Sequence, residues 1–217
     1  YEICLSDWSS DVCSSDLRVD IAGAEGDHEV ARADDRFKAV GTVVAANYGR
    51  LMREGDMSPD AALKTLEALG RQRTAEARGA EPLIVGYIPG SEAEREAAGI
   101  NDIDIVEAVQ YYRTPRGQQP GSPNKLRFTS TGAAMNWDAF AFTEHLLTQP
   151  LHIVIGSVPG GFGSYRDGLE LYARARSAQK SIQIVAGASH YELYDQPEAT
   201  GQALQQLIPF YRAHLRA

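Results

Sequence analysis

Cysteine is almost absent from this sequence, and the two cysteines that occur lie near its start. Cys4 and Cys13 both fall within residues 1–17, so the rest of the 217-residue chain contains none. A disulfide framework needs paired cysteines throughout a fold, and a thiolate metal site needs several of them together. We therefore expect no structural disulfide and no cysteine-based metal site. The absence also favours a reducing compartment, the cytoplasm.

Residues 1–17 differ in character from the rest of the chain. The stretch DWSSDVCSSDL at 7–17 is made of serines, acids and a few apolar residues, with no base. It has neither the basic start nor the continuous apolar segment of a secretory signal. A common sequencing-library adapter, translated in one reading frame, encodes this peptide. Tyr1 to Ile3 fit the translation of the upstream part of that adapter. We interpret residues 1–17 as an adapter-derived artefact, with a disordered polar tail as the alternative.

Basic residues are few, and no apolar run is long. The chain has 21 Lys and Arg against 29 Asp and Glu, a formal net charge of −8. Without residues 1–17, which hold four acids and no base, the net charge is −4. Nucleic-acid binding needs a concentrated basic surface, and crossing a bilayer needs roughly 18 consecutive apolar residues. We therefore expect neither nucleic acid nor membrane as a partner, and one domain with a substantial core.

Short apolar runs alternate with segments of helical character. Continuous runs of small and β-branched residues predict buried parallel strands at 39–45, 151–158 and 181–188. Helix-start signals and helical spacing predict helices at 58–79, 167–178 and 198–215, the last bent at Pro209. Strands that alternate with helices predict an α/β fold, in which a parallel sheet is joined by crossover helices.

The region from about residue 50 to 150 is less regular. Segments 92–100 and 102–113 look helical, whereas 114–125 (TPRGQQPGSPNK) reads as a loop rich in proline, glycine and polar residues. We expect this region to form a helical cap inserted into the α/β domain.

His190 directly follows the last predicted strand, in VAGASHYELYD. Catalytic groups gather at the carboxyl ends of the strands in parallel sheets. The ordinary pKa of histidine lies near neutrality, so a histidine there can act as a general base. The alternative is a loop histidine that is hydrogen-bonded or exposed to solvent and has no catalytic role.

The segment around His190 resembles the C-terminal third of the α/β-hydrolase superfamily, in particular its dienelactone-hydrolase-like branch. The motif of that branch, G-A-[ST]-H-x-[DE]-L-Y-D-x-P-E, is matched by Gly187, Ala188, Ser189, His190, Glu192, Leu193, Tyr194, Asp195, Pro197 and Glu198. The similarity covers about residues 34–217. It implies a partial α/β-hydrolase domain over residues 18–217 and an esterase-like hydrolase of ester, lactone or other acyl substrates. It also implies that His190 is the base of a nucleophile–His–acid triad and that no cofactor or metal takes part.

The nucleophile of such a triad is missing from the sequence. The family places it in a G-x-[SC]-x-G turn, which counting back puts near VDIAG, residues 19–23. Ile21 stands at the position of the nucleophile and has no atom that could attack. We therefore expect this chain to be the C-terminal portion of a hydrolase, inactive by itself. The alternative is a non-catalytic small-molecule binding module of the same fold.

The acid of the triad is also displaced. The family carries it in the loop after strand 151–158, near Gly160, and the nearest carboxylate is that of Asp167. Asp167 could orient the His190 imidazole through Nδ1, or it could be the N-cap of the helix that it begins. Five aromatic residues could line a substrate pocket beneath the cap or could be plain core: Tyr111, Tyr112, Trp137, Phe140 and Phe142.

The resemblance also bears on assembly. In the family's sheet, the strand that carries the nucleophile pairs with the strand at 39–45. Without that partner, the edge would expose unpaired backbone groups beside apolar side chains, and such edges associate. We therefore expect a homo-oligomer or an aggregate through this edge.

Overall fold

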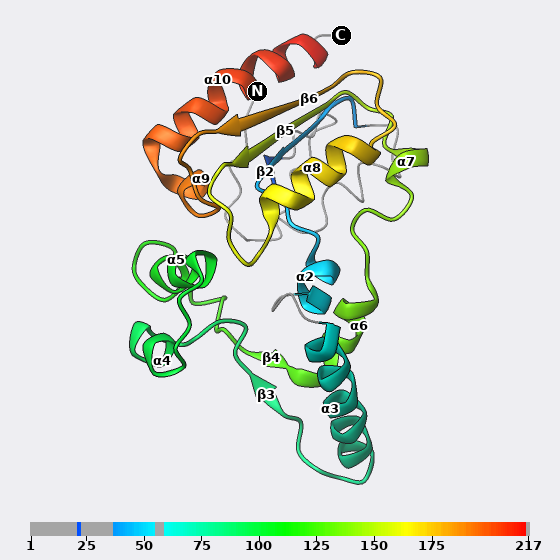
Figure 1. The fold of residues 1–217 in the computed structure, drawn as a ribbon, viewed down its shortest axis with the longest axis vertical. Coiled ribbons are helices and arrows are strands. Elements are labelled where there is room, and N and C mark those ends of the chain that lie inside the picture. The colour runs from blue at the N-terminus through cyan, green and yellow to red at the C-terminus, as the bar shows by residue number, and fades with distance from the viewer. Residues whose placement is uncertain (1–20, 23–36, 55–58, 216–217) are drawn as a thin grey trace. The chain divides into compact units, whose positions relative to one another are not determined.

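The computed structural model describes residues 21–22, 37–54 and 59–215, so the predicted adapter segment, residues 1–17, lies outside the described residues (Figure 1). The chain divides into two compact units. The first, called here the sheet unit, comprises residues 1–47, 139–159 and 163–217. The second, called the insert unit, comprises residues 48–138 and 160–162.

The sheet unit contains a parallel four-stranded sheet in the order β1-β2-β5-β6. Its strands are β1 (Ile21–Ala22), β2 (Val40–Val43), β5 (Leu151–Gly156) and β6 (Lys180–Val185). The last three coincide with the predicted apolar runs, and every pairing in the sheet is parallel. The structure therefore confirms the predicted α/β class. It also supplies β2 with a neighbour, because Ile21 and Ala22 pair with Gly41 and Thr42.

Two long helices cover opposite faces of the sheet: α8 (Ser164–Arg174) and α10 (Pro197–His214) (Figure 1). Successive strand residues point to opposite faces, and β5 shows this directly. Ile155 packs on α8 at Gly168, where a Cβ would lie 2.4 Å from Cγ2 of Ile155. Val154 instead belongs to the buried cluster that includes Leu207 of α10. β5 is therefore buried on both sides, which explains its continuous apolar sequence.

The helix boundaries differ from prediction where glycine sets the backbone. Helix α8 begins at Ser164, three residues before the predicted start, and its N-cap is Gly163 at φ 70°. Asp167 therefore lies within the first turn of α8, and its predicted alternative role as the N-cap is wrong.

A short helix that was not predicted, α9 (Glu192–Asp195), precedes α10. Helix α10 has Pro197 at its start, a position where the missing N–H costs no helical bond. Pro209 lies inside it.

The insert unit is mainly helical. The predicted helices at 58–79, 92–100 and 102–113 are present as α3 (Pro59–Ala77), α4 (Glu92–Ala97) and α5 (Ile103–Tyr112). The unit also holds α2 (Tyr48–Glu54), η1 (Phe128–Ser130), α6 (Thr131–Asn136) and a two-stranded antiparallel sheet of β3 (Ile84–Val85) and β4 (Leu126–Arg127). A further short helix, α7 (Thr143–Leu146), lies in the sheet unit.

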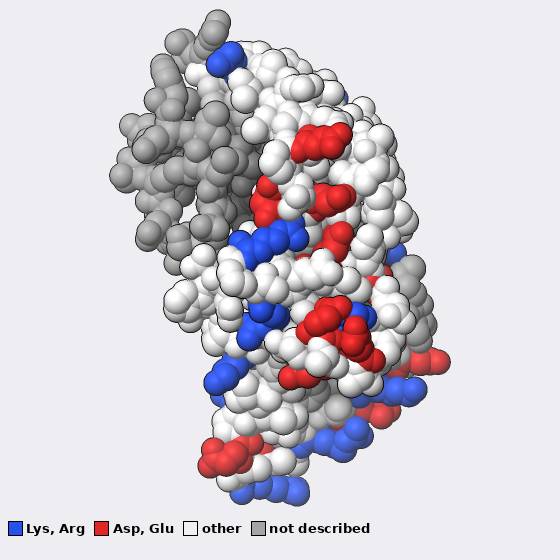
Figure 2. All heavy atoms as spheres, turned by 90° about the vertical axis from the view of Figure 1, so that its left-hand side faces the viewer, with Lys and Arg blue, Asp and Glu red and all other residues white. Residues whose placement is uncertain are grey.

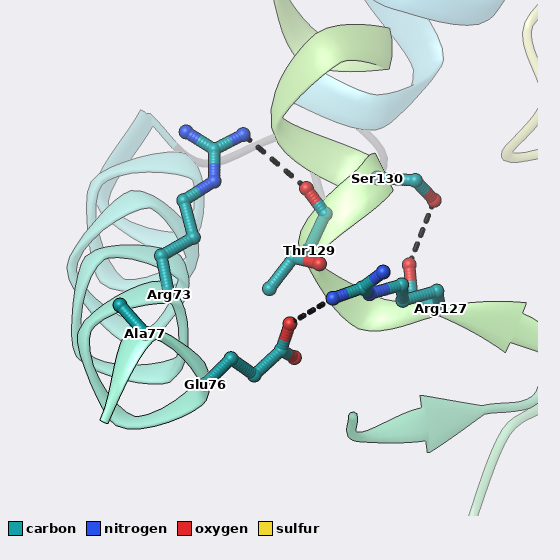
Figure 3. A pocket seen from close by; sticks show the side chains of 6 residues that line it. All are labelled: Arg73, Glu76, Ala77, Arg127, Thr129 and Ser130. Carbon is teal, nitrogen blue, oxygen red and sulfur yellow. Dashed lines mark hydrogen bonds and ion pairs between the residues drawn. The ribbon is translucent and has the colours of Figure 1, made fainter. Parts of the chain in front are cut away.

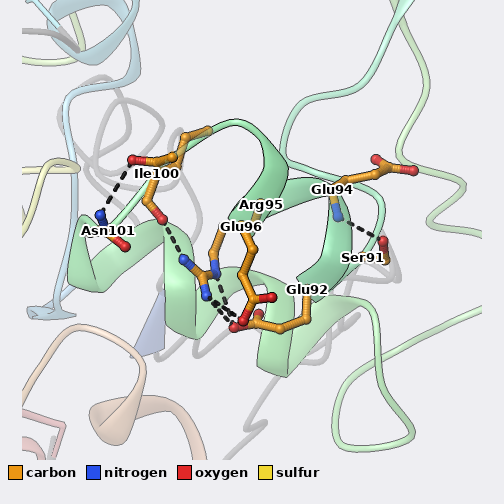
Figure 4. Close-up of polar contacts among 8 residues, drawn as sticks. Ser91, Glu92, Glu94, Arg95, Glu96, Ile100 and Asn101 are labelled. Carbon is orange, nitrogen blue, oxygen red and sulfur yellow. Dashed lines mark hydrogen bonds and ion pairs between the residues drawn. The ribbon is translucent and has the colours of Figure 1, made fainter.

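A buried arginine ties α4 to the segment that follows it (Figure 4). The guanidinium of Arg95 donates to Oε1 of Glu92 and to the carbonyl oxygen of Ile100. At the other end of the helix, the hydroxyl of Ser91 accepts from the N–H of Glu94. A side chain thus caps the start of this six-residue helix, and Arg95 holds the segment after its end, contacts that help a helix too short to be stable alone.

Candidate active site at the carboxyl end of the sheet

Three parallel strands end at the same edge of the sheet, and each is followed by a polar segment. β2 leads to Asn47, β5 leads to the loop at 157–163, and β6 leads to the turn that carries His190. β2 ends because Val44 adopts φ 47°, a left-handed conformation that a β-branched residue rarely takes. The carboxyl ends of parallel strands therefore bring these segments together.

The turn after β6 is held to the loop after β5 by backbone contacts. Gly187 adopts φ 78°, and its N–H donates to the hydroxyl of Ser157 over 2.8 Å. The N–H of Val158 donates to the carbonyl oxygen of Ala188 over 3.0 Å. This close approach requires glycine at 156, because a Cβ there would lie 2.2 Å from that carbonyl oxygen. Gly156 is thus explained by the approach of the two segments, and Gly187 by its left-handed backbone.

The residues that flank His190 fix its backbone. Ser189 and Glu192 exchange two hydrogen bonds: the Ser189 N–H donates to Oε2 of Glu192 over 2.9 Å, and the Glu192 N–H donates to Oγ of Ser189 over 3.2 Å. This reciprocal pair is a capping box, for which S-x-x-E is the sequence signal. Two positions of the motif that suggested the hydrolase resemblance, Ser189 and Glu192, therefore have a local structural explanation.

His190 is buried, with 6% of its surface exposed, and both of its ring nitrogens face hydroxyl groups. Nδ1 lies 3.0 Å from Oγ of Ser164 at the start of α8, and Nε2 lies 2.9 Å from the hydroxyl of Tyr194 in α9. Tyr191 packs edge-on against the imidazole at a ring distance of 4.9 Å. The ring is therefore held in one orientation by two hydrogen bonds and an aromatic contact.

Burial lowers the pKa of His190 from its ordinary value to about 3, because the imidazolium form loses its hydration. The imidazole is therefore neutral at neutral pH, which is the form that can accept a proton. A base with so low a pKa is weak, however. A partner that stabilises the imidazolium form would strengthen it.

Asp167, the predicted acid, is fully buried within α8. Its Oδ2 accepts a 2.7 Å hydrogen bond from the backbone N–H of Asn47, just after β2. The side chain of Asn47 in turn accepts from the N–H of Ala139 over 3.3 Å. The structure thus places Asp167 where it joins α8 to the end of β2.

The absence of a carboxylate at residue 160 has a steric cause within the insert unit. A Cβ added to Gly160 would lie 2.2 Å from Cγ of Asp104 in α5. Asp104 is fixed there, because its Oδ2 accepts from the N–H of Phe162 over 2.8 Å. Asp102 similarly accepts from the N–H of Gly161 over 2.9 Å. Burial raises the pKa of Asp104 to about 6. The sequence analysis missed this pair, because Asp near a helix start reads as an ordinary cap.

The other predicted site residues have different outcomes. Ile21 lies in β1, whereas Val19, Asp20 and Gly23 of the predicted nucleophile turn fall outside the described residues. Phe140 is fully buried, and Phe142 is 65% exposed at the start of α7 with φ 62°. Phe140 is thus a core residue, the alternative to lining a substrate pocket.

A shallow hollow of about 610 Å³ lies between α3 and the segment around η1 (Figure 3). It is lined by Arg73, Glu76, Ala77, Arg127, Thr129 and Ser130. Its two arginines are engaged, since Arg127 pairs with Glu76 and Arg73 donates to the Thr129 carbonyl oxygen over 3.3 Å. This hollow belongs to the insert unit and holds none of the predicted catalytic residues.

The surface shown in Figure 2 carries small groups of acidic side chains interspersed with basic ones. In the part of the chain that the structure describes, no three His, Cys, Asp or Glu side chains are grouped so that they could hold a metal ion. Within the same part, none of the helices is both long enough and apolar enough to span a bilayer.

Two relatives resemble the chain in sequence, and no family model matches it. The uncharacterized protein YcjY of Escherichia coli K12 is 34% identical over 197 residues, which cover 89% of this chain and 62% of YcjY. The uncharacterized protein PA2218 of Pseudomonas aeruginosa is 28% identical over 191 residues, which cover 84% of this chain and 47% of PA2218. The chain thus spans about half to two thirds of the length of these relatives.

Solved structures identify the fold. The crystal structure of the hypothetical protein PA2218 superposes with a TM-score of 0.70 at 26% identity, covering 84% of this chain and 55% of that one. The α/β hydrolase GrgF from Penicillium sp. sh18 superposes with a TM-score of 0.60 at 16% identity, covering 86% and 58%. With the parallel sheet and its flanking helices, these likenesses show an α/β-hydrolase-like fold.

Proposed function

We propose that this chain is the C-terminal portion of a hydrolase, of the dienelactone-hydrolase-like branch, that acts on ester, lactone or other acyl substrates. His190 would be the general base of its nucleophile–His–acid triad. The observation that carries the proposal is the place of this imidazole: directly after β6, at the edge where β2 and β5 also end. Its neutral state and the hydrogen bond at its Nδ1 support the same role.

In this role, Nε2 of His190 takes the proton of the attacking hydroxyl or thiol as the nucleophile adds to the acyl carbon. The imidazolium then gives that proton to the leaving group, and an acyl intermediate remains until water removes it by the same relay. The sequence offers Asp167 as the acid that orients the imidazole. Its bond to Asn47 supports another role for it, that of holding the end of β2.

The pairing of β1 with β2 supports the family's arrangement of strands, although the predicted nucleophile position, Ile21, lies within β1 and not in a turn after it. In the family, the nucleophile turn follows the strand beside the one that corresponds to β2, and here β1 pairs with β2 at Gly41 and Thr42. Ile21 in β1 offers no attacking atom. We therefore expect the 217-residue chain to hydrolyse no ester by itself. We also propose that the substrate is a small acyl compound and that the protein is cytoplasmic.

One experiment decides between this function and a non-catalytic binding module. The source gene is sequenced across the junction at Leu17 and Arg18, and its product is assayed with a generic aryl ester. The hydrolase proposal predicts an upstream G-x-[SC]-x-G turn and measurable hydrolysis. An intact start near Ile21 with no such turn would support the binding module. The low exposure of His190 and the Tyr194 hydroxyl at its Nε2 favour that alternative.

A further inference from the structure

We propose that Ser164 is the positioning residue of His190: its hydroxyl accepts the proton on Nδ1 and thereby leaves Nε2 as the proton acceptor. A neutral hydroxyl thus stands where the family uses a carboxylate. The catalytic meaning of this contact rests on the proposed function, whereas the hydrogen bond itself can be tested without any activity.

The geometry of Ser164 is well defined by the backbone around it. It is the first residue of α8, directly after Gly163 at φ 70°, and only 5% of it is exposed. Its Oγ lies 3.0 Å from Nδ1 of His190. A buried hydroxyl at this distance from a buried ring nitrogen is a hydrogen-bond partner, because either group would pay a desolvation cost without the other.

Two positions near Ser164 could carry the family's carboxylate, and the structure describes the surroundings of both. A side chain at residue 160 is excluded by Asp104, as shown above. Asp167 lies one turn along α8 from Ser164 and directs Oδ2 to the N–H of Asn47 over 2.7 Å. In the first turn of α8, the side chain of Ser164 bonds to the imidazole.

The two hydroxyl groups at the ring together select one tautomer. If Ser164 accepts the Nδ1 proton, the Tyr194 hydroxyl donates to Nε2, since that nitrogen then carries a lone pair. A hydroxyl orients the ring as a carboxylate does, but it adds no negative charge to stabilise the imidazolium. A carboxylate introduced at 164 should therefore make His190 more basic.

Nitrogen-15 NMR of the full 217-residue chain tests the proposal through the shifts of the two ring nitrogens. The wild-type chain should show His190 protonated on Nδ1. In Ser164→Ala, losing this bond should lower the ratio of the two neutral tautomers about fivefold to tenfold. Ser164→Thr, which keeps the hydroxyl, should restore the ratio, and Ser164→Asp should raise the pKa of His190. Asp167→Asn should leave the ratio unchanged.

An unchanged tautomer ratio in Ser164→Ala, in a variant whose amide spectrum stays dispersed, would overturn the proposal. So would a change of the ratio in Asp167→Asn together with none in Ser164→Ala, since Asp167 would then orient the ring. If Ser164→Ala does not fold, Ser164→Thr and Ser164→Asp still decide: an unchanged pKa of His190 in Ser164→Asp would contradict the contact. None of these outcomes depends on hydrolysis, so failure of the proposed function is recorded separately by the ester assay.

Discussion

Nε2 of His190 lies 2.9 Å from the hydroxyl group of Tyr194, one helical turn farther along the chain. This is the ring nitrogen that a general base uses to take a proton, and here a phenol covers it. Any nucleophile that reached His190 would have to replace or share this hydrogen bond. The Tyr194 hydroxyl therefore covers the reactive atom of His190.

Removing this hydroxyl should expose the reactive nitrogen to reagents. Diethyl pyrocarbonate modifies neutral imidazoles, and in the wild-type chain His190 should react much more slowly than the exposed His145. Tyr194→Phe should increase the rate at His190 about fivefold, the effect of losing one hydrogen bond. Peptide mass mapping over time measures both histidines, with His145 as the internal control. Equal rates at His190 in the two proteins would show that Tyr194 does not shield it.

Asp104 predicts a pH dependence of stability. Burial raises its pKa from the ordinary value of an aspartate to about 6, so the folded state holds this proton more tightly than the unfolded state. The stability linked to this proton is therefore fully present below the unfolded pKa and is lost as pH rises through the folded pKa. A shift of this size corresponds to at most about 3 kcal/mol.

Asp104→Asn should remove that pH dependence, because the amide oxygen can still accept from the Phe162 N–H without carrying charge. Urea unfolding should show the variant equal to wild type near pH 4 and more stable near pH 8. Asp102→Asn, on the same turn but half-buried, is the matched control. A difference between Asp104→Asn and wild type that does not vary with pH would contradict the account of this carboxyl.

Gly168 should tolerate no side chain. A Cβ there would lie 2.4 Å from Cγ2 of Ile155, so Gly168→Ala must push α8 away from β5. We expect it to lower the free energy of unfolding by about 1–3 kcal/mol. Gly201→Ala in α10 is the matched control, since an added Cβ there meets nothing within 4 Å and should stabilise the helix by up to about 1 kcal/mol. Denaturant titration compares them, and equal effects would refute the packing argument.

Association of the 217-residue chain remains a prediction. The structure alters its basis, because β1 pairs with Gly41 and Thr42, whereas we expected that edge of β2 to be unpaired. β1 and β6 are the outer strands of the sheet in the described residues, so backbone pairing between copies should still occur. Light scattering should detect dimers or larger species, with a broad transition in calorimetry. A monodisperse monomer that melts cooperatively would count against this prediction.

The parts of the fold that the sequence predicted are those set by continuous apolar runs. β5 could be found because a strand buried on both faces needs apolar residues at nearly every position, and α3 because it begins at a proline and keeps helical spacing. β3 and β4 could not be found, since each has only two residues and depends on pairing across about forty residues of chain. No local pattern encodes such a pairing.

At the candidate site, the sequence predicted where His190 lies but not what it contacts. A histidine directly after a strand is visible as a pattern, whereas Ser164 in a glycine-rich loop reads as a linker residue. The sequence also showed that glycine, Gly160, stands where the family carries the triad acid. The reason for this glycine is that the carboxyl group of Asp104 fills the space a side chain would take, and only the structure reveals that contact. Contacts between segments that are distant in sequence thus determine the geometry of the site. The sequence predicts only that these segments lie at the ends of strands.

The most direct test of the central claim is the effect of His190→Ala on the gene product that includes the sequence upstream of residue 18. Turnover of a generic aryl ester is measured for this variant and for wild type, with His145→Ala, an exposed histidine, as the control. If His190 is the general base, kcat should fall by about 10³-fold or more in His190→Ala and stay at the wild-type value in the control. An unchanged kcat in His190→Ala would contradict the account.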